Sequence, residues 1–264
     1  MTSSDEPRRS AKSELLKNLF PIVRQAGAAI LSVRDAGFET ESKEDGSPVT
    51  KADRLAEKII LDGLQRVAPD IPVVSEENAS SHMMKAPEQF FLVDPLDGTK
   101  EFAKQDGNGH YTVNIGLIED GAPVLGVVFA PALDQLYAGV VGEGAALSSA
   151  GKTHIISTRG QAEGGPVALT SISFPDAETE QWLAQHRITK TIAVGSSLKF
   201  GMLAKGDANI YARMGPTMEW DTAAGDVVLR AAGGAMTDLD GSPFTYGKKA
   251  YRNGPFIASG AVSG

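Results

Sequence analysis

The chain contains no cysteine, and this absence removes several kinds of chemistry. With zero cysteines among 264 residues, disulfide bonds, thiolate nucleophiles and cysteine-ligated zinc are excluded. Histidine is scarce, and the four that occur (His82, His110, His154 and His186) do not show the paired spacing of a zinc site. No apolar run approaches the roughly 20 residues that a transmembrane helix needs. The first ten residues also lack the apolar segment of a signal peptide, so we expect a cytoplasmic protein, with attachment to the membrane surface left open.

Basic residues are in deficit as well. The 25 Lys and Arg residues are outnumbered by 33 Asp and Glu residues, which gives a net charge of -8. This balance argues against a nucleic acid as the main partner. A small phosphorylated ligand stays compatible with it, because bound divalent cations reverse the local field of acidic side chains. The content of 42% hydrophobic and 22% charged residues is typical of a globular protein with a substantial core.

The most informative segment that is present is Asp94-Pro95-Leu96-Asp97-Gly98-Thr99. The apolar run Phe90–Val93 before it predicts a buried strand with Asp94 at its carboxyl end. Proline cannot continue a central ladder and glycine tolerates a tight turn, so the chain should bend and aim Asp94 and Asp97 at one point. The amides of Gly98 and Thr99 would then face an anion at the start of a helix.

Further acidic residues occur in similar settings. Glu76-Glu77 follows the apolar run Ile71–Val74, and Asp221 follows Trp220 just before the helical pattern of Thr222–Leu229. Carboxylates that lie close together need a cation or a proton between them. Carboxylate and carbonyl oxygens without imidazole or thiolate suit Mg2+ or Mn2+. Together these segments predict a hard-cation site beside a phosphate, although an isolated Asp-Gly pair is usually only a turn.

The order of these blocks resembles a known signature. Asp53, Glu76-Glu77, Asp94–Thr99 and Trp220–Ala224 are similar to the motifs of the lithium-sensitive, magnesium-dependent superfamily of inositol monophosphatase and fructose-1,6-bisphosphatase. Within it, four further blocks resemble 3'(2'),5'-bisphosphate nucleotidases of the CysQ type: Thr99–Phe102, Tyr111–Ile115, Leu125–Pro131 and Gly195–Phe200. The resemblance implies an α+β fold, layered as an α-β-α-β-α sandwich, with the metal site where its two halves meet.

The resemblance also implies a metal site. Two Mg2+ ions are expected, for which Mn2+ can substitute, and some family members bind a third near Glu76. The first ion would be held by Glu76, Asp94 and the main-chain carbonyl of Leu96. The second would share Asp94 and add Asp97 and Asp221. Glu77 receives no role.

Catalytic and substrate-binding roles follow from the same resemblance. Thr99 would position the attacking water, with its hydroxyl oriented by Asp53 and the water close to Glu76. Lys199, beside Ser196 and Ser197 at an expected helix start, would meet a phosphate; its alternative is a solvated lysine on a helix surface. The full set of expected substrate contacts is Leu96, Asp97, Gly98, Thr99, Ser196, Ser197, Lys199 and Asp221.

One block departs from the nucleotidase pattern and bears on the substrate. Thr170–Phe174 stands where many relatives carry Ser-Arg-Ser/Thr-His, so one bidentate phosphate donor is missing. The expected activity is removal of the 3'-phosphate from adenosine 3',5'-bisphosphate to give AMP, and from its sulfated analogue, in sulfur assimilation. The alternatives are an inositol-phosphate or sugar-phosphate phosphatase and a non-catalytic protein that binds divalent metal or phosphate. The expected partner is a small nucleotide, and the protein would be a monomer or a homodimer.

The pattern along the chain predicts two domains. We expect a disordered tail at residues 1–11, an N-terminal α+β domain at 12–156, a polar linker at 157–166 and a C-terminal α/β domain at 167–264 that carries Asp221. Helical spacing predicts helices at Ser13–Arg34, Lys51–Val67, near Ala177–Gln185, at Ser197–Lys205 and after Asp221. Strands are predicted as a meander at Val113–Leu117, Val124–Ala130 and Gln135–Val141, and near Val167, Thr191 and Asn209–Ala212.

Overall fold

The computed structural model describes residues 5–42, 48–104, 107–160 and 164–260. Its helices are α1 (Asp5–Ala36), α2 (Lys51–Val67), α3 (Thr99–Ala103), α4 (Ala177–Gln185), α5 (Leu198–Lys205) and α6 (Glu219–Ala231), with 3-10 turns at Ala79–Met83, Pro131–Leu133 and Lys249–Tyr251. The first nine strands are β1 (Thr40–Ser42), β2 (Pro48–Thr50), β3 (Val73–Ser75), β4 (Gln89–Asp97), β5 (Thr112–Glu119), β6 (Ala122–Ala130), β7 (Gln135–Val140), β8 (Gly144–Ser149) and β9 (Lys152–Ile156). The others are β10 (Val167–Ser171), β11 (Lys190–Val194), β12 (Ile210–Arg213), β13 (Thr217–Met218), β14 (Ala235–Thr237), β15 (Arg252–Asn253) and β16 (Phe256–Ser259).

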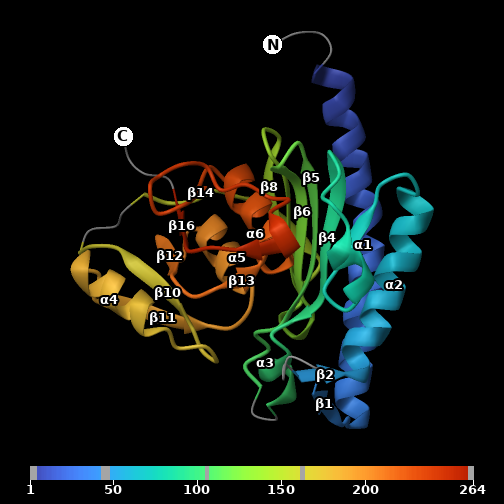
Figure 1. Ribbon diagram of the computed structural model, residues 1–264, viewed down its shortest axis with the longest axis horizontal. Helices are drawn as coiled ribbons and strands as arrows, with labels where there is room; N and C mark the ends of the chain where they lie inside the picture. Colours follow the sequence, from blue (N-terminus) through green and yellow to red (C-terminus); the bar gives the residue numbers. More distant parts are fainter. Residues whose placement is uncertain (1–4, 43–47, 105–106, 161–163, 261–264) are drawn as a thin grey trace.

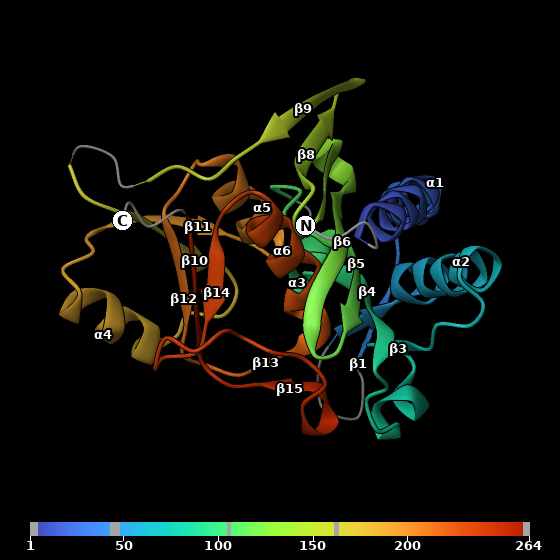
Figure 2. The ribbon, with the colours of Figure 1, turned by 90° about the horizontal axis from the view of Figure 1, so that it is seen from above.

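These elements form five layers, which Figures 1 and 2 show in succession. Helices α1 and α2 cover one face of a seven-stranded sheet of order β3-β4-β5-β6-β7-β8-β9. Helices α5 and α6 lie between its other face and a five-stranded sheet of order β11-β10-β12-β16-β14. Helix α4 forms the outermost layer (Figure 2). The α-β-α-β-α arrangement predicted from the sequence is confirmed.

The first helix is longer than its periodic pattern indicates. The apolar positions that predicted it, among them Leu19, Val23 and Ile30, are buried against α2 and the large sheet. The helix begins at Asp5, so residues 5–11, which we expected in the tail, are helical; residues 1–4 lie outside the described part. Pro7 falls in the first turn, where a missing N–H leaves no helical bond unmade. None of the described helices combines the length and apolar character needed to cross a bilayer.

The predicted meander is present and extends further. Strands β5, β6 and β7 match the three expected strands, and β8 and β9 continue the antiparallel order. The sequence of β8 is rich in small residues and β9 is mostly exposed, so neither shows the alternation of a half-buried strand. At the opposite edge of the sheet, β3 pairs with β4 in parallel, and this pairing brings the residues that follow β3 beside the end of β4.

The C-terminal half is joined to the large sheet through α6. This helix contacts β5 and β6 of the seven-stranded sheet and β14 of the five-stranded sheet. Its buried face includes Ala223, Val227 and Val228. Of the expected linker, residues 161–163 lie outside the described part, and Thr158 before them donates its N–H to Ala232 O at 2.9 Å. Because α6 contacts strands of both sheets, its first turn lies between them.

Candidate active site

Strand β4 brings Asp94 and Asp97 to the same pocket by interrupting its own pairing. Residues three apart in a regular strand point to opposite faces, but the register with β5 shifts between Asp94 and Asp97. We expected the strand to end at Asp94; it continues to Asp97, because this irregularity accommodates Pro95 without ending the ladder. The Asp94 carboxylate is buried and accepts a hydrogen bond from Leu96 N at 3.0 Å.

Gly98 makes the turn that follows. Its φ of 88° lies in the left-handed region, and a Cβ at this position would stand 3.0 Å from the carbonyl oxygen of His110. Helix α3 begins directly afterwards at Thr99. Both residues line the pocket, and the first N–H groups of a helix have no acceptor within it, as the sequence led us to expect for an anion-binding turn.

Asp53 and Thr99 meet although 46 positions separate them. Thr99 Oγ1 lies 3.3 Å from Asp53 Oδ1 and 3.2 Å from Leu96 O, so its hydroxyl proton can be donated to either. Asp53 is held from its other side, since its Oδ2 accepts hydrogen bonds from Thr50 N and Thr50 Oγ1, both at 2.7 Å. Burial raises the pKa of Asp53, while these two bonds oppose the increase.

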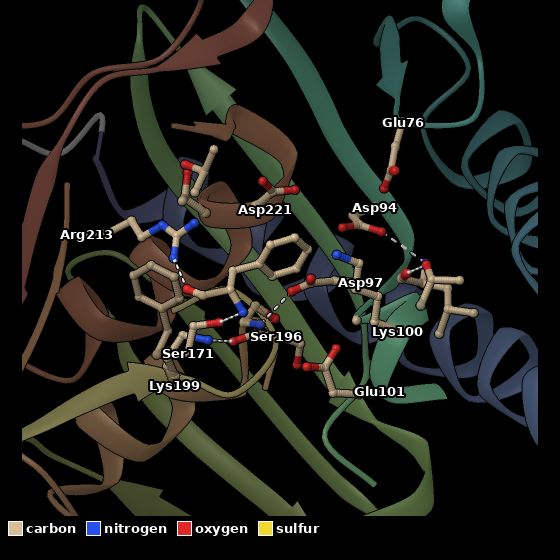
Figure 3. Close-up of a pocket in the computed structure, with 18 of the residues that line it drawn as sticks. Glu76, Asp94, Asp97, Lys100, Glu101, Ser171, Ser196, Lys199, Arg213 and Asp221 are labelled. Carbon is tan, nitrogen blue, oxygen red and sulfur yellow. Dashed lines mark hydrogen bonds between the residues drawn. The ribbon is translucent and has the colours of Figure 1, made fainter. Parts of the chain in front are cut away.

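Glu76 and Asp221 complete an acidic surface. Glu76 follows β3, and its N–H donates to Val93 O at 3.1 Å, which places it beside Asp94. Asp221 lies in the first turn of α6 and accepts a hydrogen bond from Met218 N at 2.7 Å; the helix starts at Glu219, three residues before the expected pattern that begins at Thr222. We call Glu76, Asp94, Asp97 and Asp221 the carboxylate wall, and Figure 3 shows them around one space. Glu77 does not line it.

The negative charges of the carboxylate wall need to be neutralised. Burial raises the pKa of Asp94 well above its ordinary value, and the charges of Glu76, Asp97 and Asp221 raise it further. The pKa of Asp221 is likewise raised well above normal by burial and by its acidic neighbours. Burial raises the pKa of Asp97 to about 6, against the opposing charge of Lys199. Near neutral pH these groups must therefore share protons or cations.

The donor set fits hard divalent cations. The wall offers carboxylate oxygens, the carbonyl of Leu96 also borders the pocket, and neither histidine nor cysteine lines it. Within the described residues, no three acidic or imidazole side chains are yet arranged as a ready coordination sphere. Asp94 and Glu76 are close enough for a hydrogen bond between their side chains, which helps to raise the pKa of Asp94. Ion binding would have to draw these side chains together.

Ser196 and Ser197 lie where the sequence predicted, at the start of α5, but they differ in what they contact. Ser197 is buried and ties segments together: its N–H donates to Asp97 Oδ2 at 2.5 Å, and its hydroxyl donates to Asn114 Oδ1 at 2.7 Å. Ser196 adopts a positive φ of 52° and lines the pocket. Both serines line the pocket, and Ser197 also orients Asp97 through its backbone N–H.

Lys199 is buried rather than solvated. Only 4% of it is exposed, and its Nζ donates to Val194 O at 3.1 Å and to Ser196 O at 2.6 Å. Burial lowers the pKa of Lys199 to about 8, although Asp97 and Glu101 favour its charged form. The lysine therefore lines the pocket as expected and also braces the turn that carries Ser196.

Several pocket residues carried no signal in the sequence. Ser171 ends β10, Phe174 follows this strand, and Arg213 ends β12; with Lys199 they form what we call the C-terminal wall. Lys100 Nζ lies 3.9 Å from the ring centroid of Phe174. The cavity between the two walls has a volume of about 260 Å3. Lys100, Ser171 and Phe174 fall in blocks that the sequence analysis quoted without giving these residues a role, whereas Arg213 belongs to no motif.

Comparison with known proteins extends the resemblance over almost the whole chain. The model of the inositol monophosphatase family matches residues 11–260. The 3'(2'),5'-bisphosphate nucleotidase CysQ of Escherichia coli (strain K12) is 43% identical over 235 residues, which cover 88% of this chain and 94% of that protein. The protein of the same name from Buchnera aphidicola is 37% identical and covers 93% of this chain and 94% of its own length.

Two solved structures are also similar to this chain. The crystal structure of CysQ from Bacteroides thetaiotaomicron superposes with a TM-score of 0.81 at 33% identity, covering 94% of this chain and 97% of that one. An inositol monophosphatase from Anabaena gives a TM-score of 0.74 at 25% identity, covering 96% and 92% of the two chains.

Proposed function

This chain belongs to the inositol monophosphatase family, and we propose that it is a CysQ-type 3'(2'),5'-bisphosphate nucleotidase that converts adenosine 3',5'-bisphosphate to AMP and phosphate. The observation that carries the proposal is the gathering of four acidic residues from three distant segments at one pocket, beside the Asp53–Thr99 pair. Relatives that share these segments over 88% of the chain bear the name of this activity. We further propose that the protein removes the same phosphate from the sulfated analogue of this substrate.

Enzymes of this family are metal-dependent, typically on Mg2+. We assign one ion to Glu76, Asp94 and the Leu96 carbonyl, and a second to Asp94, Asp97 and Asp221. Bound Mg2+ would neutralise phosphate charge, lower the pKa of a bound water and stabilise the leaving oxygen. The donor chemistry described above supports this assignment, and the raised pKa values of Asp94 and Asp221 supply its physical reason.

The protein's own groups would orient and deprotonate the attacking water. With its proton donated toward Asp53 Oδ1, Thr99 Oγ1 has lone pairs left to accept a hydrogen bond from water near Glu76. As the water oxygen bonds to phosphorus, its proton can pass through Thr99 to Asp53, whose raised pKa favours holding it. The bond from phosphorus to the 3'-oxygen breaks with its electron pair going to that oxygen, which takes a proton from solvent to become the hydroxyl of AMP, and Asp53 later returns its proton to solvent. The amides of Gly98 and Thr99 would hold the phosphate during this exchange.

A phosphate-release panel tests the proposal. Purified protein with Mg2+ would be assayed on adenosine 3',5'-bisphosphate, its sulfated analogue, inositol 1-phosphate and fructose 1,6-bisphosphate, with EDTA as the matched control. We expect the highest kcat/KM on the adenosine bisphosphate and no turnover with EDTA. A preference for inositol 1-phosphate would instead assign the chain to sugar-phosphate hydrolysis. Phosphate binding without turnover on any substrate would indicate a non-catalytic binding protein.

A further inference from the structure

Two acidic residues of the carboxylate wall lie on segments from different halves of the fold. Glu76 follows β3 at the edge of the seven-stranded sheet, whereas Asp221 lies in the first turn of α6. Both carboxylates line the same pocket (Figure 3). Ions can be held between such segments only if the segments keep their relative position, because a metal site depends on the placement of its ligands. The contacts that hold the Glu76 segment beside α6 therefore bear on metal binding.

His82 makes one contact with each of these segments. Its Nε2 lies 2.8 Å from Ser75 O, the carbonyl directly before Glu76; a carbonyl oxygen only accepts, so Nε2 carries the hydrogen. Its ring stacks on Trp220, the residue directly before Asp221, with the ring centroids 4.6 Å apart and 25° between the ring planes. One side chain thus connects the immediate neighbours of two carboxylates that are distant in sequence.

The two residues that His82 contacts are themselves fixed by the fold. Trp220 is buried in the core. Ser75 is fully buried, and its hydroxyl donates to Glu57 Oε1 at 2.6 Å. The Ser75 carbonyl also accepts a hydrogen bond from Asn78 N at 3.1 Å, which closes the turn that contains the acidic pair. A displaced imidazole would therefore move the backbone beside a carboxylate and not merely a flexible side chain.

The segment that carries His82 has other anchors, so the imidazole is not needed to fold it. Its ring is only partly buried. Ser81, one residue earlier, accepts a hydrogen bond from Ser75 N at 3.1 Å through its hydroxyl oxygen. Just after the 3-10 turn, Met84 O accepts a hydrogen bond from Tyr251 Oη at 2.9 Å. Removing the imidazole should leave this segment folded, which allows a specific role of His82 to be measured.

We propose that His82 is a positioning residue that holds the Glu76 turn against the start of α6, so that the carboxylate wall can bind its ions. The inference rests on the metal assignment of the proposed function but not on which phosphate ester is cleaved. The hydrogen bond orients the turn, and the stacked ring keeps it beside α6. The like charges of Glu76 and Asp221 act on each other, so without this link the two carboxylates would move apart.

Metal binding in the absence of substrate tests this role directly. His82→Ala should raise the apparent Kd for Mn2+ about 10-fold, measured by calorimetry or by electron paramagnetic resonance of the free ion. The Mg2+ concentration for half-maximal phosphate release should rise by the same factor. At saturating Mg2+, kcat and the nucleotide KM should change less than about threefold. His82→Phe keeps the stacked ring and His82→Gln keeps an N–H donor, so each should restore part of the affinity for Mn2+.

His186 provides a matched control. Its ring stacks on Trp182 with the centroids 3.9 Å apart, and its Nδ1 donates to Trp182 O at 2.8 Å. It therefore makes the same two kinds of contact as His82, but at the end of α4 and outside the pocket. His186→Ala should leave the affinity for Mn2+ and the Mg2+ dependence of phosphate release unchanged.

Each outcome decides one question. An unchanged Kd for Mn2+ in folded His82→Ala would show that the inference is wrong. So would a kcat that excess Mg2+ fails to restore, or an equal loss of affinity in His186→Ala, because both indicate a general structural defect. If His82→Ala does not fold, His82→Phe and His82→Gln replace it, and wild-type affinity in both would overturn the inference. Wild-type protein that binds no Mn2+ would instead refute the metal assignment of the proposed function.

Discussion

The two walls of the pocket carry opposite charges, and their residues are distributed differently along the sequence. The carboxylate wall comes from short contiguous motifs. Its side chains are partly or fully buried, and their like charges lie close enough to raise one another's pKa. The C-terminal wall comes from single residues on β12, α5 and the segment after β10, and its cations are held by backbone carbonyls. The comparison teaches that chemistry common to many phosphate esters can be encoded in motifs. Recognition of one particular ester depends instead on isolated side chains brought together by the fold.

The largest effect should come from the carboxylate wall. Asp94→Asn should lower kcat by about 10³-fold or more, because the assigned ions would lose their shared charged ligand. The fold should persist, since the substitution removes a buried charge that its neighbours repel. Activity assays and circular dichroism would check both points. Turnover near the wild-type rate, in this variant or after EDTA treatment, would disprove the metal assignment.

The Asp53–Thr99 pair should rank next. Thr99→Ala should reduce kcat by about 10²–10⁴-fold with little change in KM, because the variant loses the hydroxyl that orients and deprotonates water. Asp53→Asn should behave similarly, whereas Thr99→Ser, which keeps the hydroxyl, should retain most activity. Steady-state kinetics would decide: a Thr99→Ala defect confined to KM would mean that the hydroxyl only binds phosphate.

On the opposite wall, Lys199 should have a mixed and smaller effect. Lys199→Ala should raise KM for adenosine 3',5'-bisphosphate by about tenfold or less and lower the unfolding free energy by about 1–3 kcal/mol, since two carbonyls lose their donor. Kinetics and denaturant unfolding measure the two parts separately. KM for a small monophosphate should rise less; equal losses on both substrates would assign Lys199 to the cleaved phosphate or to a structural role.

Lithium should inhibit, as it does in enzymes with this signature, by occupying the site assigned to Asp97 and Asp221. Li+ is close to Mg2+ in size but has half its charge, so it would support the leaving oxygen less well. A several-fold fall in kcat is expected, uncompetitive or noncompetitive toward the nucleotide and altered by Asp97→Asn. Assays in LiCl against matched KCl would measure it. Equal rates in both salts would show that this metal position does not admit the ion.

The smallest predicted effect concerns stability without metal. The folded-state pKa of Asp97 is raised to about 6 and that of Asp94 is also raised well above its ordinary value, both chiefly by burial, so the folded protein binds protons more tightly than the unfolded chain does. The resulting stability is complete below pH about 4 and is lost as pH rises through 6. In EDTA, Tm should therefore fall by roughly 5 °C between pH 5 and pH 7.5. Millimolar Mg2+ should restore most of it, as scanning calorimetry can measure; a Tm that rises over this range would contradict the raised pKa values.

Local interactions explain why much of the molecule was predictable. Helix α2 begins at Lys51 as expected, because Thr50 and Asp53 cap it through bonds that span only three residues. The turn at Gly98 is equally local, since its positive φ is a property that glycine tolerates. In contrast, β8 and β9 were missed because their exposed and small residues carry no periodic pattern, and their pairing with β7 comes from contacts across the sheet.

The sequence by itself determined the acidic motifs and the alternation of helices and strands, because short spacings and apolar periodicity encode both; the pairing of Asp53 with Thr99 was expected from the family resemblance alone. Only the tertiary structure decided that Asp53 reaches Thr99, that Lys199 is buried and donates to two carbonyls, and that the Nε of Arg213 is buried without a hydrogen-bond partner among the described residues. These facts depend on how α2, α5 and β12 pack against the sheets. A side chain's burial and free hydrogen-bonding capacity follow from neighbours distant in sequence, which no local pattern records.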